Sequence, residues 1–206
     1  MPADFEKQEY WHARFTTETN FEWLATSEEF MHILRSDADF SRLDPSSSHL
    51  LQVGFGTSDL QNWLRAAGFE RVLNIDYEPL AVERGRQLER QRFQDVRMAY
   101  AVADATQLDL RGRRFDFVVD KSTVDAVSCG GEEALRRMCR GVWRCLAPGG
   151  FWISLSYSRW RFELDGLPFR CEEIARIPTR KLKETDPDVY HHCYKMTPKD
   201  DWVSEW

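Results

Sequence analysis

The sequence predicts a doubly wound α/β fold: a mainly parallel, seven-stranded sheet with helices on both faces and an antiparallel hairpin at its C-terminal end. Five short apolar segments alternate with amphipathic helical segments, which is the order expected of parallel strands joined by crossover helices. One segment, Phe115–Asp120, is almost continuously apolar, as expected for a strand buried on both faces. The 206 residues fit one domain, 1–206, whose composition is globular, with 42% hydrophobic and 30% charged residues.

The first 45 residues, 1–45, are expected to form a helical segment ahead of the sheet. Apolar periodicity predicts helices over residues 6–15 and 27–35. The sequence Asp-Pro-Ser-Ser-Ser at 44–48 is typical of a turn and ends this segment.

The core of the sheet is predicted within residues 46–157. Its strands are the five apolar segments 49–53, 72–75, 96–103, 115–120 and 151–157. The connecting helices are expected at 59–67, from 79 to about 92, and along the stripe Leu135, Met138, Val142, Cys145 and Leu146. Ser58 is expected to cap the first of these helices, Gly68 to end it, and Pro79 to stand in the first turn of the second.

Two further strands, 172–177 and 189–196, are predicted within residues 158–198. Because only a short link around Arg180–Lys183 separates them, we expect them to pair as an antiparallel hairpin. The tail, 199–206, is acidic and aromatic, and the sequence leaves open whether it is mobile or docked.

Charge and cysteine content restrict the class of protein. A net charge of −6 disfavours nucleic acid as a partner, because binding to phosphates needs a basic face. The five cysteines include no C-x-x-C pair and are odd in number, so neither a disulfide framework nor a zinc site is expected. The N-terminus resembles neither a signal peptide nor a transit segment, and no apolar run of about eighteen residues could span a membrane. We expect a soluble, cytoplasmic protein.

A ligand site is expected at the carboxyl ends of the strands, near the point where the strand order reverses. The first strand ends in Gly54-Phe55-Gly56, where glycines permit a tight turn and let backbone amides approach a ligand. Asp76 ends the second strand about 20 residues later, the position from which a carboxylate grips the two hydroxyls of a ribose. A plain strand-to-helix turn is the alternative for the glycines, and a helix cap or solvated turn for Asp76.

Asp59 distinguishes between two nucleotide cofactors. A dinucleotide site needs a third glycine where the helix begins, so that the helix can cradle a pyrophosphate, and this chain has Asp59 there. A carboxylate repels two phosphates but is harmless beside a zwitterionic amino acid, which favours S-adenosylmethionine over NAD. Asp104, at the end of the third strand, is placed to accept a hydrogen bond from an adenine amino group, with an Asx turn as the alternative.

The end of the fourth strand carries an acid and a base, Asp120 and Lys121, followed by Asp125. In such a sheet this loop meets the reacting end of the cofactor, so these three residues are the candidate catalytic residues. A salt bridge is the alternative. No metal-ligand spacing is found, and His191-His192, adjacent in a strand, point to opposite faces, so they are not expected to act as a pair.

Five motifs in this order resemble those of class I S-adenosylmethionine-dependent methyltransferases. They are Gly54-x-Gly56, Asp76, Asp104, Phe115-Asp116-x-Val118 and Leu146-Ala147-Pro148-Gly149-Gly150. The resemblance implies a Rossmann-like fold and S-adenosylmethionine as the cofactor.

Two segments, Glu9-Tyr10-Trp11-x-x-Arg14-Phe15 and Asp120-Lys121-Ser122-Thr123-Val124-Asp125-Ala126, carry a narrower resemblance. They are similar to a eukaryotic methyltransferase-like group whose characterised members methylate lysines in proteins, notably translation elongation factor 1A. The two resemblances imply that the cofactor contacts Trp11, Phe15, Gly54, Gly56, Asp76, Tyr77, Asp104, Ala105 and Lys121. The group commonly has tyrosine where this chain has Phe15 and glycine where it has Ser122.

This resemblance implies that residues 1–45 cover the cofactor, 46–157 bind it, and 158–198 lie on the acceptor side. Methyl transfer from a sulfonium is an in-line displacement, so positioning can supply most of the catalysis without a metal. A lysine acceptor must first lose its proton, which a desolvated aromatic channel favours. Phe21, Trp23 and Trp160 are candidate walls, with core packing as the alternative. A small-molecule methyltransferase and an inactive cofactor-binding interaction module are the other hypotheses.

Overall fold

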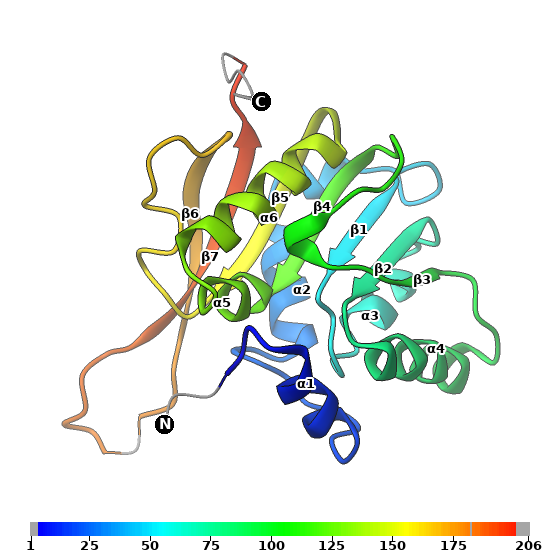
Figure 1. Cartoon of the computed structure of the whole chain (residues 1–206), viewed down its shortest axis with the longest axis horizontal. Coiled ribbons are helices and arrows are strands. Elements are labelled where there is room, and N and C mark those ends of the chain that lie inside the picture. The colour runs from blue at the N-terminus through cyan, green and yellow to red at the C-terminus, as the bar shows by residue number, and fades with distance from the viewer. Residues whose placement is uncertain (1–3, 182, 201–206) are drawn as a thin grey trace.

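The computed structural model describes residues 4–181 and 183–200. Seven strands form one sheet in the order β3-β2-β1-β4-β5-β7-β6 (Figure 1). They are β1 (Leu50–Val53), β2 (Val72–Asp76), β3 (Ala99–Val102), β4 (Phe115–Lys121), β5 (Leu146–Ser156), β6 (Phe169–Pro178) and β7 (Tyr190–Pro198). Strands β1 to β5 pair in parallel, and β7 pairs antiparallel with both β5 and β6. The predicted sheet and its C-terminal hairpin are confirmed.

Helices cover both faces of the sheet (Figure 1). They are α1 (Gln8–Phe15), α2 (Ser27–Ser36), α3 (Leu60–Ala66), α4 (Pro79–Phe93), α5 (Thr123–Ser128) and α6 (Glu132–Cys145), with 3-10 turns η1 (Phe40–Arg42) and η2 (Ala105–Gln107). Helices α2, α3 and α4 pack on one face, and α5 and α6 pack on the other. None of the helices in the described part of the chain is long and apolar enough to cross a membrane.

Each strand contributes to two hydrophobic cores. Leu50 joins the core beneath α2 and α3, and the next residue, Leu51, joins the core beneath α6. In β4, Phe117 joins the first of these cores and Val118 joins the second. Because successive side chains of a strand point to opposite faces, only a continuously apolar strand can fill both cores.

The strand order reverses between β1 and β4. From β1 the chain proceeds outward through β2 and β3, then returns to place β4 on the other side of β1. The carboxyl ends of β1 and β4 therefore border the crevice in which such folds bind ligands. Helix α1 lies across this edge, where Gln8 Nε2 donates a hydrogen bond to the Tyr77 carbonyl oxygen at 2.6 Å.

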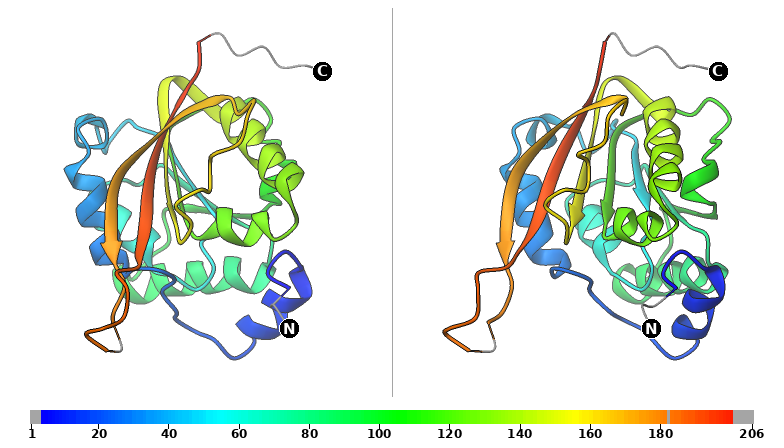
Figure 2. Two further views of the ribbon diagram at one scale, coloured as in Figure 1. Left: turned by 90° about the vertical axis from the view of Figure 1, so that its left-hand side faces the viewer. Right: turned by 60° about the vertical axis from the view of Figure 1, so that its left-hand side comes forward.

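The C-terminal hairpin joins the sheet through its second strand, β7. β7 lies between β5 and β6, with Ser154 opposite Tyr194. Lys195 on β7 binds Asp37 at 2.7 Å and Asp39 at 2.6 Å, which ties the end of α2 to this strand. The connection between β6 and β7 projects beyond the rest of the molecule (Figure 2).

Several local predictions need correction. Asp59 occupies the N-cap position of α3, one residue later than expected, but its side chain makes no capping hydrogen bond; the Ser58 hydroxyl, as predicted, accepts one at the start of the helix, from the Leu60 amide at 3.3 Å. Residues 123–128 form α5 where a loop was expected, and β3 begins only at Ala99. Gly68 confirms its predicted role, since its φ of +98° lies in the left-handed region that ends a helix.

The five cysteines are free thiols. Of the tail 199–206, residues 201–206 lie outside the described residues, and they include most of the segment whose docking the sequence left open.

Candidate active site

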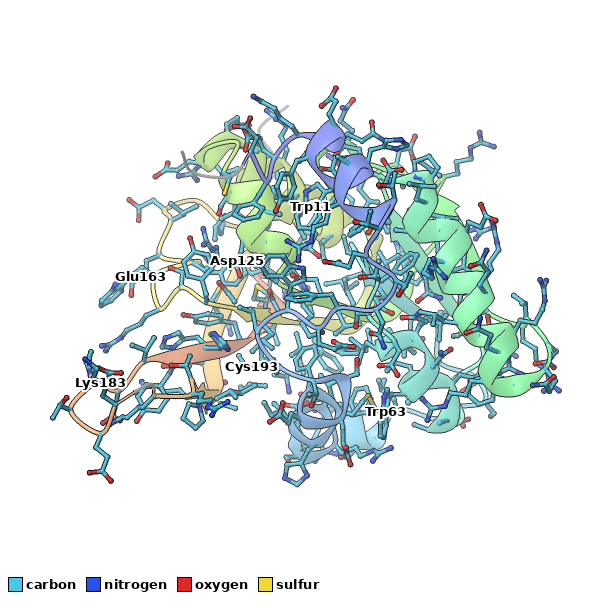
Figure 3. The ribbon with its side chains drawn as sticks, turned by 90° about the horizontal axis from the view of Figure 1, so that it is seen from below. Trp11, Trp63, Asp125, Glu163, Lys183 and Cys193 are labelled. Carbon is cyan, nitrogen blue, oxygen red and sulfur yellow. The ribbon has the colours of Figure 1, made fainter. Side chains whose placement is uncertain are left out.

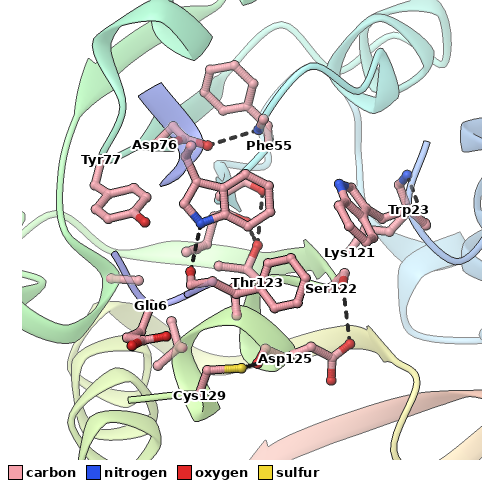
Figure 4. Close-up of a pocket in the computed structure, with 18 of the residues that line it drawn as sticks. Glu6, Trp23, Phe55, Asp76, Tyr77, Lys121, Ser122, Thr123, Asp125 and Cys129 are labelled. Carbon is pink, nitrogen blue, oxygen red and sulfur yellow. Dashed lines mark hydrogen bonds between the residues drawn. The ribbon is translucent and has the colours of Figure 1, made fainter. Parts of the chain in front are cut away.

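A cavity of about 640 Å³ lies at the carboxyl ends of the strands, beneath the N-terminal segment. All nine residues that the sequence predicts for the cofactor line it: Trp11, Phe15, Gly54, Gly56, Asp76, Tyr77, Asp104, Ala105 and Lys121. Asp76 and Tyr77 lie on one side of the cavity, and Lys121 and Trp23 lie on the other (Figure 4). The structure thus brings together residues from four strands and the N-terminal helix.

The glycine turn after β1 leaves no room for a side chain at Gly54. Gly54 and Gly56 have φ angles of +62° and +54°. A Cβ atom on Gly54 would lie 2.3 Å from Oγ1 of Thr123, the first residue of α5. The Thr123 hydroxyl donates to the carbonyl oxygens of Val53 at 2.8 Å and Gly54 at 3.0 Å. The turn is therefore locked against α5.

Asp76, the last residue of β2, holds the turn from the other side. Its Oδ2 accepts a hydrogen bond from the Gly56 amide at 2.9 Å, and its Oδ1 accepts one from the Glu78 amide at 3.0 Å. Burial raises the pKa of Asp76 to about 6. Each carboxylate oxygen has two lone-pair directions, so both retain capacity to accept a hydroxyl of a ligand.

Asp104 combines the two roles that the sequence left open. It lines the cavity, and its Oδ1 accepts hydrogen bonds from the Thr106 amide and hydroxyl, both at 2.8 Å. Its Oδ2 accepts from Gln107 Nε2 at 2.9 Å. The side chain thus forms the Asx turn that begins η2 and presents a fixed carboxylate to the cavity.

The N-terminal segment closes the cavity with aromatic side chains. Trp11 donates from its indole nitrogen to the Phe5 carbonyl oxygen at 2.7 Å, and its ring lies 5.4 Å from that of Phe15. Phe15 packs over Gly56, where an added Cβ atom would lie 3.4 Å from the ring. Trp11 and Asp125 lie toward the middle of the molecule, whereas Lys183 is at its periphery (Figure 3).

Lys121, the last residue of β4, is not available as a base. Its Nζ donates to the Glu22 carboxylate, the Trp23 carbonyl at 3.3 Å and the Ala25 carbonyl at 3.2 Å. A charged ammonium group has three donor hydrogens and no lone pair, so it cannot accept a proton. Although burial lowers the pKa of Lys121, the adjacent Glu22 carboxylate favours its charged form.

Asp125, on α5, lines the cavity and anchors the chain that follows β5. Its Oδ1 accepts a hydrogen bond from Ser156 Oγ at 2.5 Å and pairs with Arg161 at 2.9 Å, and its Oδ2 accepts from the Tyr157 amide at 3.1 Å. Burial raises the pKa of Asp125. This side chain therefore determines where Tyr157 meets the cavity.

Asp120 does not reach the cavity, which corrects its selection as a catalytic candidate. The side chain is fully buried and accepts hydrogen bonds from Trp152 Nε1 at 2.9 Å and the Val124 amide at 3.2 Å. Burial raises the pKa of Asp120 to about 7. Its residue type and place at a strand end fit a catalytic acid, but the side chain turns inward to hold the start of α5.

On the side of the cavity predicted to admit the methyl acceptor, only two of the three candidate aromatic walls are present. Phe21 and Trp23 line the cavity, whereas Trp160 does not and is 60% exposed. Leu24 and Tyr157, which line this side, were not singled out in the sequence. Neither residue belongs to a motif, although Tyr157 is the last residue of the predicted fifth strand and directly follows β5, where ligand-facing residues are expected.

The two adjacent histidines have separate partners, as their alternation in a strand predicts. His191 Nδ1 bonds the Leu24 carbonyl at 2.6 Å, and His192 Nδ1 bonds Glu173 at 2.6 Å. Within residues 4–181 and 183–200 there is no group of three or more His, Cys, Asp or Glu side chains suited to a metal ion.

The beginning of α3 is occupied by a carboxylate that the sequence argument did not identify. Glu22 accepts hydrogen bonds from the Ser58 hydroxyl at 3.0 Å and the Asp59 amide at 3.2 Å. Asp59 itself does not line the cavity, and its nearest cation is Arg92 at 3.8 Å. Glu22 does not line the cavity either, but its carboxylate accepts the hydrogen bond of the Asp59 amide, so this amide is not free to bind a phosphate.

The glycine turn, the strand-end carboxylates and the doubly wound sheet define a nucleotide-binding enzyme of the methyltransferase type. The sequence matches the methyltransferase domain family over residues 51–154. The chain therefore belongs to this family, and its fold is that of the class I S-adenosylmethionine-dependent methyltransferases.

Two relatives and one solved structure are similar to this chain. It is 52% identical over 203 residues to methyltransferase srdJ of Neurospora crassa, a match covering 97% of this chain and 86% of that protein. It is 27% identical over 198 residues to the mouse eEF1A lysine and N-terminal methyltransferase, covering 89% of this chain but only 27% of the length of that protein. The N-methyltransferase NodS of Bradyrhizobium japonicum, solved with S-adenosyl-L-homocysteine, shares the fold with a TM-score of 0.65 at 17% identity, covering 94% of this chain and 98% of NodS.

Proposed function

We propose that this methyltransferase transfers the methyl group of S-adenosylmethionine to a lysine side chain of a protein substrate. The observation that carries the proposal is one continuous cavity. It extends from Asp76 and Asp104, suited to a nucleoside, to the aromatic side chains Phe21, Trp23 and Tyr157 beyond Lys121. A nucleoside site that opens onto an aromatic channel suits the methylation of an amine.

The residues of the cavity fit this cofactor. Asp76 would accept the ribose hydroxyls, Asp104 and Ala105 would border the adenine, and the Gly54–Gly56 turn would admit the amino-acid portion against the backbone. Phe15 and Trp11 would cover the bound molecule. When bound, S-adenosylmethionine supplies an electrophilic methyl group; the protein needs to align the acceptor and exclude water.

The acceptor channel favours a neutral amine. Phe21, Trp23 and Leu24 are contributed by the segment between α1 and α2, and Tyr157 by the chain after β5. Aromatic rings attract a lysine as it enters, and desolvation among them lowers the pKa of its ammonium so that a proton is released. Because Lys121 is fully hydrogen-bonded, it does not serve as the base. The substrate lysine therefore releases its proton to solvent, which requires no base on the protein.

The choice of lysine is supported by a relative's name. The mouse protein is an eEF1A lysine and N-terminal methyltransferase, so translation elongation factor 1A is the first substrate to test. Because that factor acts in the cytoplasm, the proposal includes a cytoplasmic location. Methyltransferase srdJ, at 52% identity, has a name that specifies no acceptor, so small molecules are included in the same test.

The experiment uses purified protein and radiolabelled S-adenosylmethionine with two separate fractions of a cell extract, its proteins and its small molecules. Label on a lysine of translation elongation factor 1A or another protein, located by mass spectrometry, supports the proposal. Label only on an N-terminal amine or only on small molecules overturns the lysine assignment. Binding of S-adenosylhomocysteine without any transfer indicates an inactive interaction module. The Asp76→Ala variant is the control, because a lost charge-assisted hydrogen bond should weaken cofactor binding by about 1–3 kcal/mol.

A further inference from the structure

We infer that Glu22 and Lys121 are positioning residues that form an ionic latch. The latch holds the strap, defined as residues 16–26 between α1 and α2, over the cofactor cavity. The inference goes beyond the proposed function, because it concerns how the cofactor is retained and does not depend on the identity of the methyl acceptor.

The latch joins residues that are 99 positions apart in the sequence. Both side chains are largely buried, with Lys121 4% and Glu22 21% exposed. Lys121 directs all its protons at the strap, namely at Glu22 and at the carbonyl oxygens of Trp23 and Ala25. Since no proton of this ammonium remains for a ligand, its contribution to the site is exerted through the strap.

Two carboxylates fasten the strap to the glycine turn as well. Glu18 accepts a hydrogen bond from the Thr57 hydroxyl at 2.9 Å. Glu22 accepts from the Ser58 hydroxyl and from the Asp59 amide at the beginning of α3. One carboxylate, that of Glu22, thus connects the strap, the end of β4 and the start of α3.

The strap is held in a strained conformation. Leu24 has a φ of +68°, and the Ala25 amide donates to the Trp23 carbonyl at 2.7 Å across it, which closes a γ-turn. A positive φ at a residue other than glycine is strained and persists only where the surrounding structure determines it. Here the surroundings are Lys121 on one side and His191 Nδ1, which bonds the Leu24 carbonyl, on the other.

The strain places aromatic side chains where they line the cavity. Phe21 and Trp23 lie with their ring centroids 5.1 Å apart. The Arg14 guanidinium stacks on both rings, at 4.8 and 4.6 Å from their centroids, without itself lining the cavity. Releasing the latch should therefore free the strap and loosen this wall of the cofactor site.

The test measures binding of S-adenosylhomocysteine by calorimetry to the full-length wild type, Glu22→Gln, Lys121→Met and the double variant. Breaking one partner of a buried pair leaves the other uncompensated, so each single variant should lose about tenfold in affinity. The double variant should bind about as weakly as either single variant, because both remove the same interaction. Arg42→Met, which breaks the exposed pair between Arg42 and Asp39, is the matched control and should bind as the wild type does.

Hydrogen exchange measured by mass spectrometry separates positioning from direct contact. Both single variants should show faster exchange of strap amides, with thermal unfolding checked in parallel. If Lys121→Met is too unstable to study, Glu22→Gln provides the same test, because glutamine preserves the shape and the acceptor facing Ser58. Additive losses in the double variant, wild-type affinity in the single variants, or lost affinity with unchanged exchange in the strap would each overturn the inference.

Discussion

Gly54 and Thr123 are in such close contact that a single added carbon atom would lie 2.3 Å from the threonine hydroxyl oxygen. The glycine directly follows β1, and the threonine begins α5 after β4. The hydroxyl also donates to the carbonyl oxygens of Val53 and Gly54. The contact fixes the glycine turn relative to the end of β4, where Lys121 lies, and to α5, which carries Asp125.

The Gly54→Ala variant should lose binding of S-adenosylhomocysteine. Its φ of +62° is unfavourable for alanine, and the new methyl group would displace Thr123, so we expect a loss of at least about 2 kcal/mol in the free energy of unfolding. Urea denaturation and calorimetry measure the two effects. Gly112→Ala is the control: its φ is +78°, but nothing lies within 4 Å of the added carbon. That variant should lose only about 1 kcal/mol and keep its affinity. Normal affinity in Gly54→Ala would contradict the assignment of the turn.

The Ser122→Gly variant should stabilise the protein. Ser122 has a φ of +69°, in the region that favours glycine, which accounts for the glycine at this position in the group that the sequence resembles. Relief of the strain should add about 0.5–1 kcal/mol to the free energy of unfolding, reduced by the lost hydrogen bond from Ser122 Oγ to Asp125 at 3.2 Å. Chemical denaturation measures the change. Ser128→Gly, within α5 itself, should instead destabilise the protein, and equal effects of both variants would refute the explanation.

Cofactor affinity should rise as the pH rises through about 6. Burial raises the pKa of Asp76 to about 6 in the folded protein, while Glu78 adds a repulsive charge. Ribose hydroxyls donate to the ionised carboxylate, so binding favours loss of its proton and weakens below that pH. Calorimetry of S-adenosylhomocysteine between pH 5 and 8 checks this, and Asp76→Asn should bind weakly with a much flatter pH profile. An unchanged profile in that variant would assign the dependence to another group.

The same pKa shift predicts how Asp76 affects stability in the absence of ligand. A carboxyl group whose folded pKa lies above the ordinary 3.8 binds more protons in the folded state than in the unfolded state. Its contribution to the free energy of unfolding therefore falls as the pH rises from about 4 to about 6. Denaturant unfolding across this range should show a steeper decline for the wild type than for Asp76→Asn. A parallel decline in both would contradict the shift.

Trp23→Ala should raise the KM for the methyl acceptor more than it lowers kcat measured at saturating acceptor. The ring of Trp23 lines the cavity near Phe21, so its removal takes away apolar and cation–π contacts to an entering amine worth about 1 kcal/mol or more. Steady-state kinetics with the identified substrate measures both constants. Trp160→Ala is the matched control, because Trp160 is exposed and does not line the cavity. A larger effect of Trp160→Ala on KM would contradict this assignment and would place the acceptor site at the outer surface.

Much of the fold could be predicted because its evidence is local. The strand at 115–120 is recognisable from its continuous apolar run, and Pro79 and Gly68 mark helix ends through their own backbone restrictions. The nine residues predicted to contact the cofactor line one cavity because they lie at the ends of successive parallel strands, whose carboxyl ends must meet at one edge, or belong to the N-terminal motif. Helix α5 was missed because it has only six residues and follows a strained N-cap residue, Ser122.

By itself, the sequence determined the α/β class, the order of the strands along the chain and the residues that line the cavity at the strand ends, since these depend on periodicity and on neighbours in the chain. The tertiary structure decided which charged groups are free to act. The Asp120 side chain points inward and accepts a hydrogen bond from Trp152. Lys121 donates all three of its hydrogens, to Glu22 and to two carbonyl groups. Glu22 also accepts a hydrogen bond from the amide at the start of α3. These outcomes depend on contacts between residues as many as 99 positions apart, whose desolvation and pairing no local pattern encodes.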